Sequence, residues 1–227
     1  MDYQGNYFPD DHDENESKIY RTVKRIFKWT MYGISLLIYI ILFVVLIANR
    51  DSGILEKNYF TDIEEYKDVD KSEMSLYNIH TRIFMNDDGS LQLHDIDYSD
   101  KYCLLEIGVK FNAKKVTDGE YGDSLNFELK DENGNTYPIV NIVTDKNGRY
   151  GFYRVCFSGI DIDVNSNDLY YDPQSNPDPK KIQKFTLTVS RKSDGKIIPV
   201  KIEDGKAVNE FIIYDNKTTF SSIDYND

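Results

Sequence analysis

A single run without charged residues, Trp29–Asn49, limits what this chain can fold into more than any other feature. Its length matches the roughly 20 apolar residues that a helix needs to cross the hydrocarbon core of a bilayer. A secretory signal has a shorter apolar centre of about 7 to 15 residues and ends in small residues, and both features are missing here. A buried core helix would need a large apolar protein around it, whereas the rest of this chain is polar. We therefore expect a retained transmembrane helix at 29–49.

The charges on either side of this run predict its orientation. Two bases, Arg50 and Lys57, follow the run among acids, and five precede it: Lys18, Arg21, Lys24, Arg25 and Lys28. Because positive flanks stay on the cytoplasmic side, residues 1–28 are expected to form a cytoplasmic tail. The remainder is then extracytoplasmic. The expected location is the cell membrane, with the lipid bilayer as the first partner.

The charge balance limits which classes of partner, other than the bilayer, the chain is expected to bind. The net charge is −12 and the isoelectric point is about 4.7. Binding of nucleic acid through counterion release requires many lysines and arginines, so a nucleic-acid partner is not expected. The richness in Asn, Asp, Lys, Ile and Tyr is typical of AT-rich bacteria, in which the outer side of the membrane faces the cell wall.

Beyond an acidic, weakly periodic segment at 50–72, interpreted as a juxtamembrane stalk, apolar residues alternate with polar ones. The predicted strands are "SLYNIHTRIFM", "SLQLHDIDY", "YCLLEIGVKFN", "SLNFELKD", "TYPIVNIV", "RYGFYRVCF", "KFTLTVSR", "KIIPVKI" and "NEFIIYD". Turn signals such as "NDDGS", "DENGN", "DKNGR" and "KSDGK" separate them, and "FELKDENGNTYPIV" is predicted to be a hairpin. Residues 73–227 are therefore predicted to form an all-β domain, an antiparallel immunoglobulin-like β-sandwich. The strand "YCLLEIGVKFN" is expected to have one side in the core and one in water.

Two cysteines and one long loop are the candidate site residues. Cys103 and Cys156 both lie on the outer side, where a disulfide is permitted, and a bridge and a pair of inert thiols are equally compatible with the sequence. By strand alternation, Cys103 is expected to point into the core. The proline-rich segment "DVNSNDLYYDPQSNPDPKK" predicts a surface loop, in which Tyr170 and Tyr171 resemble the contact residues of binding loops. A simple crossover between sheets is the alternative.

Motifs for catalysis or metal binding are weak. The outer domain has two histidines that could act as a general base, His80 and His94, and no G-x-S-x-G or zinc motif accompanies them. The segment Asp161–Asp172 has alternating oxygen ligands of the kind that calcium prefers. It has Ser166 where the calcium loop needs glycine, and its last ligand is aspartate instead of glutamate. We therefore expect no cofactor, no metal site and no enzyme activity.

The run from Tyr102 to Ile202 resembles the telokin-like, immunoglobulin-type exported domains of unknown function found on bacterial lipoproteins and single-span anchors. The resemblance rests on "YCLLEIGVKFN", "FELKDENGNTY", "GRYGFYRVCF" and "FTLTVSRKSDGKIIPVKI". It departs from the lipoprotein form in having an apolar span in place of a lipidated cysteine. It implies the fold and an exported position, and it implies no catalytic residue.

Three functions are compatible with these features. The first is a binding or scaffolding module that the anchor presents to a protein, peptide or wall-polymer partner. The second is a structural subunit of a secretion, conjugation or division complex in the cell envelope. The third is an envelope hydrolase, which would need a nucleophile beside one of the two histidines. The sequence favours the first and leaves the oligomeric state open.

Overall fold

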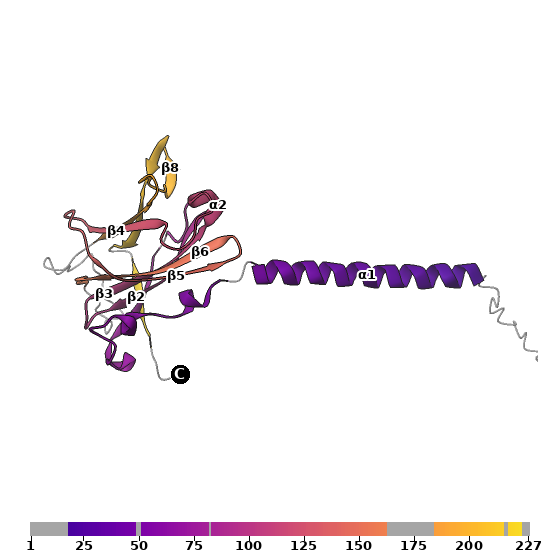
Figure 1. Ribbon diagram of the computed structural model, residues 1–227, viewed down its shortest axis with the longest axis horizontal. Coiled ribbons are helices and arrows are strands. Elements are labelled where there is room, and N and C mark those ends of the chain that lie inside the picture. The colour runs from indigo at the N-terminus through magenta and orange to yellow at the C-terminus, as the bar shows by residue number, and fades with distance from the viewer. Residues whose placement is uncertain (1–17, 49–50, 82, 163–183, 216–217, 224–227) are drawn as a thin grey trace, which may run out of the picture. The chain divides into compact units, whose positions relative to one another are not determined.

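The computed structural model describes residues 18–48, 51–81, 83–162, 184–215 and 218–223. The chain divides into two compact units, 1–49 and 50–227. The first contains one helix, α1 (Lys18–Ala48), which is continuous from the basic segment through the apolar run (Figure 1). The second contains antiparallel β-sheets.

Helix α1 has the length and surface of a membrane-crossing segment. The candidate membrane span Thr22–Leu46 has 25 residues, which at 1.5 Å per residue cover roughly 37 Å, more than the ~30 Å of a hydrocarbon core. Its side chains, Trp29 among them, are exposed, as a helix with lipid around it requires. A membrane anchor and a signal sequence share these properties.

The described residues of the second unit form three antiparallel sheets. The six-stranded sheet has the order β11-β1-β2-β3-β6-β5, the three-stranded sheet β10-β7-β4, and β8 and β9 make a separate hairpin. The strands are β1 (Leu76–His80), β2 (Leu91–Ser99), β3 (Leu104–Asn112), β4 (Leu125–Asp131), β5 (Ile139–Asn147), β6 (Tyr150–Ser158), β7 (Phe185–Arg191), β8 (Lys201–Glu203), β9 (Lys206–Val208), β10 (Glu210–Tyr214) and β11 (Thr219–Ser222). The short helices are η1 (Gly53–Glu56), η2 (Phe60–Asp62), η3 (Lys71–Glu73) and α2 (Ala113–Val116). The prediction of an all-β domain is confirmed, and its immunoglobulin-like arrangement stays a prediction.

One hydrophobic core joins the six-stranded and three-stranded sheets. Strand β3 contributes Leu105, Ile107 and Val109 to this core, and β4 and β7 contribute the facing leucines, valine and phenylalanines. The ring of Phe127 on β4 meets the ring of Tyr153 on β6 at 5.0 Å between centroids. Aromatic rings in this edge-to-face arrangement stabilise the contact beyond simple area burial.

The predicted hairpin "FELKDENGNTYPIV" forms only in part. Its turn closes as expected, with Gly134 at a positive φ of 82° and an isolated bridge between Lys130 and Thr136. Beyond Tyr137 the chain crosses to the other sheet, so that β5 pairs with β6 and β4 pairs with β7. The turn signal is local, whereas the choice of partner strand depends on which sheet buries each apolar face.

The outer face of β3 and β6 is buried as well, and the expectation that β3 has one side in water is wrong. Every residue of β3 from Leu104 to Val109 is buried. The cover is the segment 51–74, which the sequence pattern suggests is a stalk. Its Leu55, Phe60 and Met74 are buried, and the last two belong to a second core cluster with Leu104.

Candidate functional site

No disulfide joins Cys103 and Cys156 in the structure, and Cys103 is placed differently from the expectation. Cys103 lies in the turn before β3 with a φ of 53° and is half-buried, so it does not point into the main core. Cys156 on β6 is buried in the second cluster, beside Phe60 and Leu104. Burial raises the pKa of the Cys156 thiol well above its ordinary value. A thiol that stays protonated in an apolar setting is unreactive.

The remaining sequence candidates do not come together. Tyr170, Tyr171 and most of the calcium-type loop lie outside the described residues. Among the described residues, no group of three His, Cys, Asp or Glu side chains could hold a metal ion. Within the same part of the chain, His80 contacts Ser221 across β1 and β11 at 3.0 Å, and both are exposed at the edge of the sheet.

His94 has a different environment. Its ring is half-buried beside Gly108, and its Nε2 has no hydrogen-bond partner among the described residues. Burial lowers the pKa of His94, so the ring is neutral at pH 7. Its contacts are with the sheet and the covering segment, and no serine or cysteine hydroxyl or thiol is bonded to it in the described residues.

A buried ion cluster fastens the covering segment to the sheet. The Arg154 guanidinium donates to the Glu106 carboxylate at 2.6 Å and to the Asp97 carboxylate at 2.8 Å. It also donates to the Asp95 carbonyl oxygen at 2.8 Å, and the backbone N–H of Tyr59 donates to Glu106 at 2.9 Å. Two carboxylates thus share one guanidinium under the cover, which makes this cluster a structural element and not an open site.

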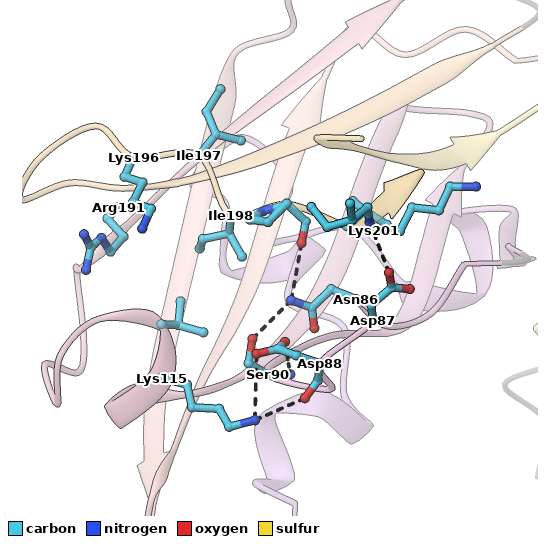
Figure 2. A pocket seen from close by; sticks show the side chains of 14 residues that line it. Asn86, Asp87, Asp88, Ser90, Lys115, Arg191, Lys196, Ile197, Ile198 and Lys201 are labelled. Atoms are coloured by element: carbon cyan, nitrogen blue, oxygen red, sulfur yellow. Dashed lines mark hydrogen bonds and ion pairs between the residues drawn. The ribbon is translucent and has the colours of Figure 1, made fainter. Parts of the chain in front are cut away.

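An open pocket lies between α2, the turn before β2 and the segment that leads into β8 (Figure 2). Its volume is about 320 Å³, comparable to a small ligand-binding cleft. The lining residues are Asn86, Asp87, Asp88, Ser90, Lys115, Val116, Arg191, Lys196, Ile197, Ile198, Pro199, Val200, Lys201 and Ile202. Sequence positions more than a hundred residues apart therefore meet at this site.

Hydrogen bonds between the two walls hold the pocket in shape. The side chain of the buried Asn86 donates to Ser90 at 3.1 Å and to the Pro199 carbonyl oxygen at 3.4 Å. The backbone N–H of Asp87 donates to the carbonyl oxygen of Val200 at 2.8 Å. Because buried polar groups need such partners, these bonds fix the segment before β8 to the turn. The pocket is therefore a built feature of the fold.

The charged groups around the pocket are mostly cations. Lys115 contacts the Asp88 carbonyl oxygen at 3.2 Å and its carboxylate at 3.8 Å, and Arg191 pairs with Asp118 at 2.7 Å. The side chain of Lys196 makes no ion pair with any described residue and is exposed. Four cations and two carboxylates line the pocket, in a protein whose net charge is −12. Arg191 also pairs with Asp194, and Lys201 pairs with Glu203 at 3.1 Å, so neighbouring carboxylates offset these cations.

The floor of the pocket is aliphatic, and its rim exposes apolar side chains. Val116, Ile198 and Val200 are buried at the floor. At the rim Ile197 is 41% exposed and Ile202 is 61% exposed. A neighbouring depression shares Asp87, Val200 and Lys201 with the pocket. Its lining also includes the exposed side chains of Phe84 and Met85. Contiguous exposed apolar surface next to a polar rim is typical of an interaction site.

Strand β5 is a second exposed surface. Among the described strands it pairs only with β6, and it is the edge of the six-stranded sheet. Three of its apolar side chains, Ile139, Val140 and Ile142, are 36–42% exposed. Unpaired backbone N–H and C=O groups along such an edge can accept another strand.

Sequence reasoning missed the pocket. The run "KSDGKIIPVKIEDGK" is predicted to be a strand around "KIIPVKI", whereas only Lys201–Glu203 is a strand and Pro199 lies in irregular backbone. The usable signal was the concentration of lysine and isoleucine around a proline in an acidic chain. Comparison with protein-family models, curated proteins and solved structures gave no match.

Proposed function

We propose that this chain is a single-pass membrane protein that presents its β-domain outside the cell as a binding module. In this proposal α1 is a retained anchor, supported by the length of its apolar stretch and by the missing cleavage site. The five bases before the span support a cytoplasmic N-terminus.

The observation that carries the proposal is the pocket of Figure 2. Its apolar rim is left in water at a cost in free energy that a bound partner would remove. Its lining combines charged side chains, from three lysines, an arginine and two aspartates, with aliphatic residues, and such a combination can bind and orient a ligand. Hydrogen bonds from Ser90 hold the pKa of Asp88 below its ordinary value, so this carboxylate is not a proton donor near neutral pH.

A photo-crosslinking amino acid at Ile197 tests the proposal in cells that carry the full chain in its native membrane. We expect a discrete crosslinked product that is absent when the same amino acid replaces Asn133, an exposed turn residue outside the pocket lining. Equal products from both positions, or none from either, would count against a binding site at the pocket.

The unpaired edge of β5 favours a second candidate, a structural subunit of a cell-envelope complex. In such a complex another strand would extend the six-stranded sheet through β5, as in other cases of strand addition. The variant Ile142→Lys places a charge on this edge and is expected to prevent the added strand from pairing with β5. Exchange of the span for an unrelated apolar helix separates the candidates, because a simple anchored module keeps its activity and a subunit with contacts in the membrane loses it.

A further inference from the structure

His94 lies on β2 beneath the covering segment, with part of its ring left without a partner. A Cβ placed on Gly108 would lie 3.1 Å from Nη1 of Arg154 and 3.2 Å from both Cβ of His94 and Cδ2 of Leu55, so these three side chains converge over Gly108. The Nε2 atom of His94 is buried and has no hydrogen-bond partner in the described part of the chain. Such an atom is rare in native proteins and calls for a structural or functional reason.

Charged groups act on His94 from every element packed against it: Asp51 before η1, Asp95 on β2, Lys110 on β3 and Arg154 on β6. Burial lowers the pKa of the ring, the two cations lower it further, and the two acids oppose this change. The ring is therefore neutral at pH 7 while η1 lies over it.

The acids near His94 are either engaged or in water. Asp51 already forms an ion pair with the lysine of β3, and Asp95 is exposed. Glu106 and Asp97 are buried, and both are bonded to the guanidinium of the ion cluster. A proton on His94 would therefore add a third cation beneath the cover, where the buried carboxylates described already have a partner.

The first part of the covering segment rests directly on this ring. Helix η1 contacts β2, β5 and β6, and its Leu55 is 3% exposed. On one side of η1 the Ser52 hydroxyl donates to the Asp145 carboxylate on β5, and on the other the Tyr59 backbone N–H donates to Glu106 at 2.9 Å. A charge on the ring thus acts on a short apolar contact between two polar attachments.

We propose that His94 makes the closure of η1 over the sheet sensitive to acid, because protonation of the ring releases η1 and lets the ring reach water. The direction follows from proton linkage. The closed state has the lower pKa and binds the proton less tightly than the open state. Closure is therefore fully favoured above the ordinary histidine pKa of about 6.5 and is weakened as the pH falls below it. The inference goes beyond the proposed binding function and does not depend on the pocket of Figure 2.

Amide hydrogen exchange of the full chain in lipid nanodiscs, read by mass spectrometry at neutral pH and near pH 5, tests this closure. Exchange times are scaled for the intrinsic effect of pH, so that only protection is compared. We expect peptides that cover 53–59 to lose protection several-fold near pH 5, with a ceiling of about thirtyfold for an open state with an ordinary histidine pKa. Peptides from β7, in the three-stranded sheet, should keep their protection.

Two matched variants assign the response to one ring. His94→Gln keeps a polar side chain that stays neutral at both pH values, and we expect it to remove the acid-dependent loss at 53–59. His80→Gln is the control, because His80 is the other histidine of the β-domain and lies exposed on β1. It should respond as the wild type does. The titration of Glu106 and Asp97 is common to all three proteins, and near-ultraviolet circular dichroism checks that each variant is folded.

A measurement on the unsubstituted ring covers the case in which His94→Gln does not fold. Nitrogen NMR of the wild-type chain with labelled histidine follows the charge of His94, and glutamine variants of His12 and His80 assign the other two signals. We expect the loss of protection at 53–59 to follow that charge. Equal protection at both pH values, an unchanged acid response in His94→Gln, a lost response in His80→Gln, or a His94 ring that titrates above the ordinary pKa would each overturn the inference.

Discussion

Replacement of Arg154 by alanine tests whether the buried ion cluster attaches the segment 51–74 to the sheet. The Arg154 side chain is 1% exposed, and its two partners, Glu106 and Asp97, are 1% and 8% exposed. The variant leaves both carboxylates buried without a cation. Removal of one partner from a buried ion pair costs about 3–5 kcal/mol, a large share of the 5–15 kcal/mol that stabilises a typical domain.

The pH dependence of this loss is a sharper test than its size. Burial raises the pKa of Glu106 and of Asp97 above their ordinary values, and the Arg154 guanidinium opposes the rise. A raised folded pKa means that the folded state binds the proton more tightly than the unfolded state, so the contribution to stability is present at low pH and is lost as pH rises through the folded pKa. Without the guanidinium both pKa values rise further. The loss in free energy of unfolding caused by Arg154→Ala should therefore be largest near neutral pH and shrink as the pH is lowered toward 5.

The assay is urea unfolding of the full chain in detergent micelles, followed by near-ultraviolet circular dichroism of the tyrosines at two pH values. Tryptophan fluorescence is unsuitable because Trp29, the one tryptophan, lies in the apolar span. Arg149→Ala, at an exposed arginine in the turn before β6, is the control and should cost less than about 0.5 kcal/mol. If Arg154→Ala lowers the free energy of unfolding by less than about 1 kcal/mol, or by an amount independent of pH, the cluster does not attach the segment 51–74 to the sheet.

Other measurements check the packing, the thiols and the orientation. Gly151→Ala should lower the melting temperature, with a cost of about 1–3 kcal/mol, because the new Cβ would lie 2.3 Å from ring atoms of Phe111, whereas Gly53→Ala has no atom within 4 Å and should be neutral. Unreduced, denatured protein should take up two alkyl groups by intact mass, since no disulfide joins Cys103 and Cys156, and the buried Cys156 should resist alkylation before denaturation. In intact cells, a membrane-impermeant maleimide should label Cys103 if the β-domain is outside; labelling only after lysis would contradict the orientation.

The β-domain shows how far local patterns predict structure. The strands β2, β3, β4, β6 and β7 match predicted segments because alternating apolar residues and Gly-containing turns are local properties. The pairing of β5 with β6, in place of β4, could not be read from the turn "DENGN". The candidate pocket was missed because its walls come from 86–90, 115–116 and 191–202, which only folding brings together.

The sequence by itself determined the apolar helix, the all-β character of the outer part and the acidic surface, since each depends on composition or on a short repeat. The tertiary structure decided which faces are buried. Glu106 has the pattern of a residue on the solvent side of a strand, yet the covering segment buries it with Arg154. The same long-range packing directs Pro199 and Ile198 to the turn at Asn86 and so forms the pocket. Local repeats set the secondary structure, and contacts between distant segments set the site.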